Sequence, residues 1–281
     1  MKKEICSTQD YLVSGETFSI LWDESKGFAA THPQPFADKL GSYYESEAYI
    51  SHNESQQSVV GFLYRFARKY MFRIKHNMFK KLLPGDATIL DYGCGTGGFL
   101  EYTSSKSYKS FGVETNANAR DQAIGKNLNI AESWEKLSQE KFNLICMWHV
   151  LEHVSDLDQC VQEMQKRLNT NDILLIAVPN LNAFDALHYA EFWAAFDVPR
   201  HLWHFSQSGI KQLIEPNGFD LIAQHPLILD ALYIAYVSEK HKGSRFALIK
   251  GTFRGLQSNW KAKKTGEYSS LVYLFRKTKE L

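Results

Sequence analysis

Apolar residues along this chain form short unbroken runs that alternate with stretches of helical periodicity. The runs at 142–148 and 172–178 are almost continuously apolar, as strands are when helices cover both faces of their sheet. Between them, 157–168 is periodic like an amphipathic helix, and Ser155 and Asp156 before it are typical helix caps. The pattern predicts strand–helix–strand units around a buried sheet.

The segment 56–83 has the pattern of one long helix that Pro84 ends. Apolar residues recur on one face. The other face is basic and carries Arg65, Arg68, Lys69, Arg73, Lys75, Lys80 and Lys81. A membrane-surface or nucleic-acid helix would also look like this. We predict the commoner arrangement, in which the helix docks on the core and its charges are solvated.

The most informative polar positions lie in the run ILDYGCGTGGFL at 89–100. It predicts a strand, a glycine turn that lets a ligand approach the backbone, and a helix with unpaired first N–H groups. Gly93, Gly95 and Gly98 satisfy G-x-G-x-x-G, so a nicotinamide-dependent oxidoreductase is an alternative. Asp91 argues against it, because a carboxylate before the turn suits a cationic ligand better than a pyrophosphate.

The same run resembles the nucleotide-binding loop of the class I S-adenosylmethionine (SAM) methyltransferases, in which an acidic residue precedes G-x-G-x-G. Glu114 ends the next predicted strand, about 20 residues further on, where doubly wound folds have an acid that binds ribose hydroxyls. The resemblance implies that role for Glu114. The residues implied at the cofactor are Asp91, Tyr92, Gly93, Cys94, Gly95, Gly97, Glu114, Trp148 and His149.

Two further elements strengthen this resemblance. The tetrad LEHV at 151–154 is similar to the end of the fourth strand in a subgroup that includes quinone O-methylating enzymes, and DVPRH at 197–201 resembles a DxPRH element of that subgroup. The family has an α/β fold, with a Rossmann-like, seven-stranded, mostly parallel sheet and helices on both faces. The resemblance implies 219–228 as the sixth strand and 268–277 as the antiparallel last strand. It also implies SAM as cofactor and S-adenosylhomocysteine as product.

Domain organisation follows from these placements. Residues 1–55 are a small amino-terminal segment, and 56–281 are the methyltransferase domain, with helical insertions at 180–206 and 229–267. The amino-terminal segment resembles a zinc-ribbon module that precedes some bacterial members of the family. The four cysteines form no C-x-x-C pair and only Cys6 lies in this segment, so a remnant without metal is implied, and we expect no metal ligands.

The region around 183–205, AFDALHYAEFWAAFDVPRHLWHF, follows the fifth predicted strand and is dense in aromatic residues. Ligands of open α/β sheets lie at the carboxyl ends of the strands, so this excursion is expected to cover the acceptor pocket. Arg200 either binds an anionic group of the acceptor or pairs with Asp197 to fix the loop. We also expect Trp193, Tyr43 and Tyr44 at the acceptor. The last two, with His52, form either a lid or plain packing.

A general base is needed if the acceptor is a hydroxyl or phenol. Histidine titrates near neutrality, and His149 lies at the tip of the fourth predicted strand, so it is the first candidate. Packing against the cofactor is its alternative role. His201 and His204 are the next candidates.

Composition adds limits rather than a function. The chain has 281 residues, 44% of them hydrophobic, and a net charge of +1, which gives no reason to expect nucleic acid. No apolar stretch approaches the ~20 residues of a membrane span, and the amino terminus lacks a signal sequence, so a cytoplasmic protein is expected. The insertion at 229–267 is basic, and we leave open whether its charges select an anionic substrate. Oligomeric state is left open.

Three functions remain after these arguments. The first is a SAM-dependent methyltransferase that acts on oxygen or carbon of a small molecule, such as a sugar, a phenol or quinone precursor, or a lipid-linked intermediate. The others are a nicotinamide-dependent oxidoreductase and a non-catalytic SAM-binding protein. The first is our prediction, and the acceptor is not determined by the fold.

Overall fold

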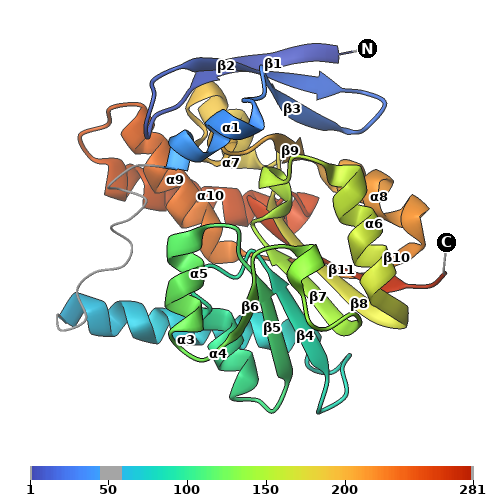
Figure 1. The fold of residues 1–281 in the computed structure, drawn as a ribbon. Helices are drawn as coiled ribbons and strands as arrows, with labels where there is room; N and C mark the ends of the chain where they lie inside the picture. The colour runs from blue at the N-terminus through green and yellow to red at the C-terminus, as the bar shows by residue number, and fades with distance from the viewer. Residues whose placement is uncertain (1, 45–58, 280–281) are drawn as a thin grey trace.

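One seven-stranded sheet forms the centre of the computed structural model, which describes residues 2–44 and 59–279 (Figure 1). Its strand order is β10-β11-β8-β7-β4-β5-β6, and β11 runs antiparallel to both of its neighbours. The strands are β4 (Thr88–Tyr92), β5 (Lys109–Val113), β6 (Asn129–Ala131), β7 (Phe142–Trp148), β8 (Leu168–Pro179), β10 (Phe219–Pro226) and β11 (Ser270–Lys277). The predicted Rossmann-like sheet with an antiparallel last strand is confirmed.

Helices cover both faces of this sheet, as its apolar strands require. Along β7, Leu144 and Cys146 belong to one core cluster, while Ile145 and Met147 belong to the other. The first cluster includes residues of α3 (Val59–Phe79) and α4 (Gly98–Ser104). The second includes residues of α6 (Leu157–Arg167) and α8 (Gln207–Ile214). Alternate residues of a strand point to opposite faces, so burial on both faces makes the run continuously apolar.

The helix starts are encoded locally. Asp156 accepts a hydrogen bond from the Gln159 amide at 2.9 Å and caps α6, as its position before the periodic segment predicts. Ser206 caps α8 in the same way, and Asn116 caps α5 (Ala117–Ile124). Such caps pair amide groups that the first helical turn leaves without an internal partner.

A second, four-stranded sheet lies above the first in Figure 1. It consists of β1 (Lys2–Gln9), β2 (Thr17–Asp23), β3 (Phe28–His32) and β9 (Trp203–Phe205), all antiparallel. We predicted 180–206 as a helical insertion. It contains α7 (Phe184–Tyr189) and the short helices η5 (Ala190–Phe192) and η6 (Ala194–Phe196), but it ends in β9, which pairs with β3. A three-residue strand whose partner is far along the chain leaves no local periodicity to recognise.

The remaining elements are short turns and one helical hairpin. The hairpin consists of α9 (Ile228–His241) and α10 (Ala247–Thr265), within the predicted insertion at 229–267. The short elements are α1 (Ala37–Leu40), η1 (Gly41–Tyr44), η3 (Trp134–Lys136), η4 (Leu151–His153) and η7 (Glu215–Asn217). Among the described residues, no helix is both long and apolar enough to cross a bilayer. His52 lies outside the described residues.

One prediction about α3 is wrong. Lys75 does not belong to a solvated basic face, because its ammonium lies over the Trp148 ring, 4.1 Å from the centroid, at the end of β7. It also lies 5.7 Å from the centre of the Phe99 ring on α4. The helical period correctly indicated an amphipathic helix. It could not show which of several basic positions faces the strand ends.

Candidate functional site

The glycine turn between β4 and α4 has the geometry of a place where backbone meets a ligand. Gly93, Gly95 and Gly97 have φ of 76°, 55° and 75°, a region that favours glycine. A Cβ on Gly93 would lie 2.4 Å from the Val150 side chain, and one on Gly97 would lie 2.4 Å from Leu128. At Gly95 nothing lies within 4 Å. The outer two glycines therefore permit packing, while the middle one faces open space.

Glu114 follows the end of β5 and turns back toward this loop. Its Oε2 accepts a hydrogen bond from the Gly95 amide at 2.8 Å, and its Oε1 accepts one from the Asn116 amide at 2.8 Å. Each carboxylate oxygen has a second lone pair, so the group can still accept hydroxyl donors. The carboxylate predicted to bind ribose is thus held beside the open glycine.

Asp91 is the penultimate residue of β4 and lies in the protein interior, where it is 3% exposed. Burial raises the pKa of its carboxyl to about 7, although the nearby charge of Lys75 opposes the shift. Burial in turn lowers the pKa of Lys75, and Asp91 is the main charge that counteracts this effect. The ammonium of Lys75 therefore lies on the Trp148 indole and partly balances the charge of Asp91.

Two of the predicted cofactor residues turn their side chains into the protein. The Tyr92 ring stacks on Trp134, with 4.3 Å between ring centres, and packs against a core cluster. Cys94 is buried, and its sulfur occupies the space that a side chain at position 112 would need.

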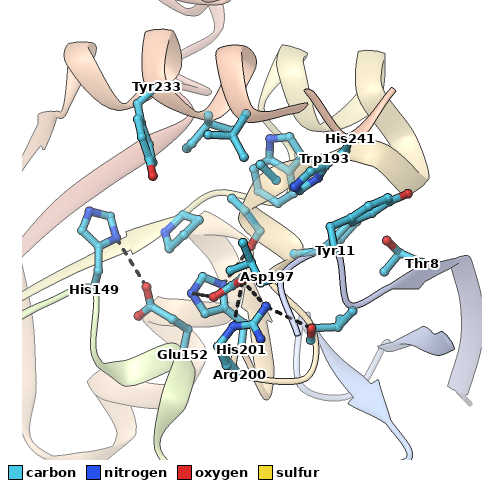
Figure 2. Close-up of a pocket in the computed structure, with 18 of the residues that line it drawn as sticks. Thr8, Tyr11, His149, Glu152, Trp193, Asp197, Arg200, His201, Tyr233 and His241 are labelled. Atoms are coloured by element: carbon cyan, nitrogen blue, oxygen red, sulfur yellow. Dashed lines mark hydrogen bonds and ion pairs between the residues drawn. The ribbon is translucent and has the colours of Figure 1, made fainter. Parts of the chain in front are cut away.

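A cavity of about 360 Å³ lies beyond the tip of β7, between the amino-terminal sheet, the η6 loop and α9 (Figure 2). Its walls are largely apolar and include Trp193, Phe196, Ile234 and Val237. His149, Glu152 and Asp230 form a charged group at one side. Apolar walls with a few convergent polar groups are typical of small-molecule sites.

His149 is fixed between two carboxylates. Its Nε2 lies 3.0 Å from Oδ2 of Asp230, and its Nδ1 lies 3.4 Å from Oε1 of Glu152. The backbone of His149 has a positive φ of 57°. Burial disfavours the charged imidazole, but the two carboxylates outweigh burial and raise the pKa of His149 to about 10. Its side chain is 35% exposed. At neutral pH the ring is therefore protonated, and it must lose a proton before it can act as a base.

Arg200 is 1% exposed and uses its donors within the protein. It donates to Asp197 Oδ1 at 2.6 Å, to Asp10 Oδ1 at 3.0 Å and to the Tyr43 carbonyl at 3.0 Å. Of the two alternatives for Arg200, this geometry favours the one in which it fixes the loop. Because Asp10 follows β1, the ion pair also ties the amino-terminal sheet to the loop that covers the cavity.

Of the aromatic residues predicted to contact the acceptor, Trp193 lines the cavity, whereas Tyr43 and Tyr44 do not. Trp193 lines the cavity, and its Nε1 donates to Asp185 Oδ2 at 2.9 Å. The Tyr43 hydroxyl bonds to Glu16, and the Tyr44 hydroxyl lies 3.0 Å from Nδ1 of His153. Neither tyrosine lines the cavity.

The two other candidate histidines also differ. His201 lines the cavity, whereas His204 lies outside it, with Nε2 2.9 Å from the Thr31 hydroxyl across the β3–β9 pair. Burial lowers the pKa of His204 to about 3, so its ring is neutral. His204 supports the smaller sheet rather than contacting a ligand in the cavity.

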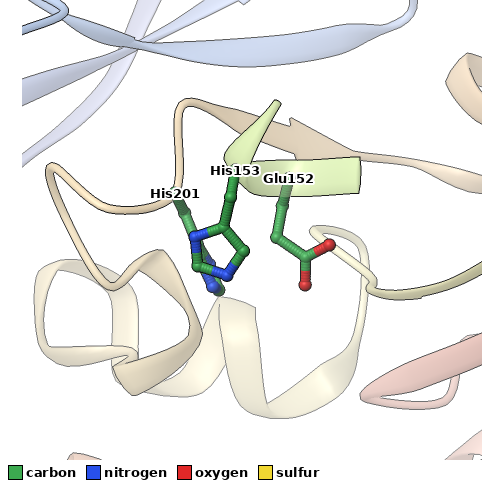
Figure 3. A group of neighbouring side chains, drawn as sticks. All are labelled: Glu152, His153 and His201. Atoms are coloured by element: carbon green, nitrogen blue, oxygen red, sulfur yellow. The ribbon is translucent and has the colours of Figure 1, made fainter. Parts of the chain in front are cut away.

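Glu152, His153 and His201 lie close enough together to hold a metal ion (Figure 3). Their ligand atoms lie within 4.8 Å of one another. The Nδ1 atoms of His153 and His201 bond to the carbonyls of Arg200 and Ala195, at 2.9 Å and 2.8 Å. With Nδ1 donating, the lone pair is on Nε2, which is the usual arrangement of a histidine ligand. The sequence showed two of these residues in LEHV, but only the fold brings His201 beside them.

Comparison with known proteins agrees with this architecture. Residues 63–224 match the family model described as a methyltransferase domain. A SAM-dependent methyltransferase from Methanosarcina mazei is similar in structure, with a TM-score of 0.50 and 17% identity over 72% of this chain and 97% of that one. The [4+2]-cyclase SpnF is also similar, with a TM-score of 0.52 and 13% identity over 74% of this chain and 80% of that one. No curated protein sequence matches significantly.

Proposed function

We propose, from the premise that the chain belongs to the methyltransferase domain family, that it transfers the methyl group of SAM to oxygen or carbon of a small molecule bound in the cavity beside His149. The observation that carries the proposal is the Glu114 carboxylate on the amide of Gly95, the one turn glycine that faces open space. This pairing fits a nucleoside ligand, whose ribose offers two neighbouring hydroxyl groups.

The residues at the strand ends suit SAM in charge as well as in shape. Glu114 would accept the ribose hydroxyls, and the Gly95 backbone would allow close approach. Asp91 supplies negative charge at the strand ends, which Lys75 partly balances, and the Trp148 indole offers a face to a cationic group. When bound, the cofactor supplies an electrophilic methyl group on a sulfonium, and S-adenosylhomocysteine is the product.

The acceptor side supplies position and a path for a proton. The apolar walls exclude water, which favours displacement between two positioned reactants. His149 is the proposed proton acceptor, and Asp230 and Glu152 orient it. The charge on His149 at neutral pH means that the deprotonated ring is a minor but strongly basic form. His201 is the second candidate, while the position of His204 excludes it from our proposal.

We propose that the amino-terminal sheet is a zinc-ribbon-like remnant that works without its metal. Burial, together with the charges of Glu191 and Glu4, raises the pKa of Cys6 to about 11. The thiolate is the form that binds metal, so Cys6 is a poor ligand. Elemental analysis of purified protein would refute this idea if zinc is present and remains after His201→Ala has removed the other candidate metal group.

Calorimetric titration of the full chain tests the cofactor. S-Adenosylhomocysteine should bind, NADH should not, and Glu114→Ala should weaken the binding about 100-fold, because hydrogen bonds to a charged group are lost. Glu101→Gln, at an exposed position on α4, is the matched control and should bind like the wild type. Preferential binding of NADH would instead support the oxidoreductase alternative.

A second experiment separates catalysis from simple binding. The protein is incubated with labelled SAM and a panel of sugars, phenols and lipid-linked hydroxyl compounds, and labelled product is measured. Transfer to any of them supports the proposal. The cyclase relative has this fold and a different reaction in its name, so binding of SAM with no transfer across the panel would favour a non-methylating role.

A further inference from the structure

The outer face of α10, together with the residue just before the helix, carries a regular stripe of large apolar side chains. Its members are Phe246, Ile249, Phe253, Leu256 and Trp260, each between 56% and 71% exposed. They are spaced three or four residues apart, so they lie along one side of the helix. A soluble surface tolerates single apolar residues, but a continuous row of this length indicates an interaction surface.

The opposite face of α10 explains why the stripe points outward. Small residues there are buried against α9, and a Cβ on Gly251 would lie 2.4 Å from the Tyr236 backbone. A Cβ on Gly255 would lie 2.7 Å from the Ala231 carbonyl. Such close backbone contact permits one rotational setting of α10. The helix therefore cannot rotate to bury the stripe in the core, and the stripe faces outward.

Positive charges accompany the stripe. The segment 245–265 contains no acidic residue, and its basic residues are Arg245, Lys250, Arg254, Lys261, Lys263 and Lys264. The whole chain has a net charge of only +1, so the charge is concentrated here. Three of these residues directly follow stripe positions in the sequence, which puts cationic groups along the edge of the apolar row.

A hollow beside the stripe brings the two properties together. It has a volume of about 570 Å³ and is lined by the stripe residues Ile249 and Phe253 together with Lys242, Lys250 and Arg254. His188 also lines it, and its pKa is lowered by burial and by the charges of Arg254 and Lys242. Glu239 faces the hollow too, but the Tyr189 hydroxyl bonds to it. The hollow is thus a cationic place with an apolar border.

We propose that the α9–α10 hairpin docks on an anionic lipid bilayer, with phosphate headgroups at the Lys242, Lys250 and Arg254 hollow and the apolar stripe among the acyl chains. Interfacial helices with aromatic and aliphatic residues on one face and Lys or Arg beside them bind membranes in this way. A second copy of the chain is disfavoured as the occupant, because it would bring two rows of like charge together.

The location of the surface gives the proposal a functional consequence. Tyr233, Ile234 and Val237 of α9 line the acceptor cavity, so one hairpin borders both the cavity and the proposed membrane surface. Docking would hold that cavity near a bilayer and favour an acceptor that is itself lipid-linked. Membrane binding is measured without a methyl donor, so this inference does not stand or fall with the proposed reaction.

Co-sedimentation of the full chain with vesicles is the test. We expect binding to vesicles that contain phosphatidylglycerol and at least tenfold weaker binding to pure phosphatidylcholine. Raising the salt from about 0.05 M to 0.5 M should weaken binding about tenfold, since screening acts on the charges. Inorganic phosphate at matched ionic strength should not compete, which separates a bilayer from a free phosphate ligand. Equal binding to both vesicle types, or to neither, would overturn the proposal.

Variants separate the two components of the surface. Phe253→Ser with Leu256→Ser removes apolar contacts, and Lys250→Gln with Arg254→Gln removes charge. Each pair should weaken vesicle binding about tenfold or more. Ile124→Ser on α5 and Lys80→Gln with Lys81→Gln alter similarly exposed residues elsewhere and should have no effect.

Two further measurements exclude the other occupants. All variants must retain the wild-type thermal unfolding temperature, which shows that they are folded and does not depend on the proposed cofactor. Light scattering should find that the wild-type protein does not associate through the stripe. If the wild type does associate and the Phe253→Ser and Leu256→Ser pair abolishes the association, the stripe binds a second copy of the chain and the proposal is wrong. An acidic polypeptide is added to the vesicles at an equal concentration of negative charge. If it displaces all of the vesicle-bound protein, the surface binds an acidic protein instead.

Discussion

The glycine turn and the acceptor cavity differ in how far apart their parts lie along the chain. Gly93, Gly95 and Glu114 come from two consecutive strand–turn units, and parallel pairing of β4 with β5 brings them together. The cavity needs the amino-terminal sheet, the tip of β7, the η6 loop and α9 at once. The cofactor half is therefore a local motif on a general fold, whereas the acceptor half is an assembly of distant segments.

The assembly of the acceptor half can be broken at Arg200. Arg200→Met should lower the free energy of unfolding by about 4 kcal/mol, because the carboxylates of Asp10 and Asp197 would lose the cation that balances their charge. The amides of Leu12 and Ser14 would still donate to Asp10. Denaturant unfolding measures this change, with Arg73→Met at an exposed position of α3 as the control. Unchanged stability combined with a raised KM for the acceptor would show that Arg200 binds substrate.

The local character of the cofactor half can be tested by two alanine substitutions. Gly93→Ala should cost about 3 kcal/mol of stability, since positive φ and the contact with Val150 add up. Gly95→Ala should cost only about 1 kcal/mol, because its surroundings are open. Thermal unfolding compares their stability, and calorimetry should show that Gly95→Ala nevertheless weakens S-adenosylhomocysteine. Similar stability losses for both would mean that Gly95 is also a packing residue.

Acid should lower the stability of the four-stranded sheet, which borders the acceptor cavity. His204 is neutral in the folded protein because burial lowers its pKa to about 3, while in the unfolded chain it titrates near 6.5. The unfolded state gains protons first as pH falls, so stability is lost below about pH 6.5. Between pH 7 and pH 5 the loss from this residue is about 2 kcal/mol. Denaturant unfolding of His204→Gln should lack that part of the pH dependence, and an identical profile would contradict the assignment.

The reaction itself should report on the charge of His149. If the deprotonated ring accepts the proton, kcat/KM should rise with pH, about tenfold per pH unit from neutrality toward about 10, where the pKa lies. His149→Gln should be slower and should lose this slope. The affinity for S-adenosylhomocysteine, measured over the same range, controls for damage to the cofactor half. A flat profile in the wild type would mean that His149 acts as a charged, positioning group.

Lys75 and β9 show why prediction succeeded in one half and failed in parts of the other. The order of apolar runs, the cap at Asp156 and the acidic residues near the strand ends are local, and each appears in the structure where the pattern indicated. The sequence placed Lys75 on the basic face of α3, but the packing of α3 against the sheet places its ammonium over the Trp148 ring. The pairing of β9 with β3 joins segments that local periodicity cannot relate.

By itself, the sequence determined the succession of strands and helices along the chain, the turn glycines and the two carboxylates beside them, because strand period, capping and backbone freedom act over a few residues. Only the tertiary structure decided that Arg200 forms ion pairs with Asp10 and Asp197 and that His149 is charged. It placed His201 beside Glu152 and His153. It also decided that α10 turns its large apolar residues outward. Burial and the distance between charges set these properties, and both depend on contacts between segments far apart in the chain.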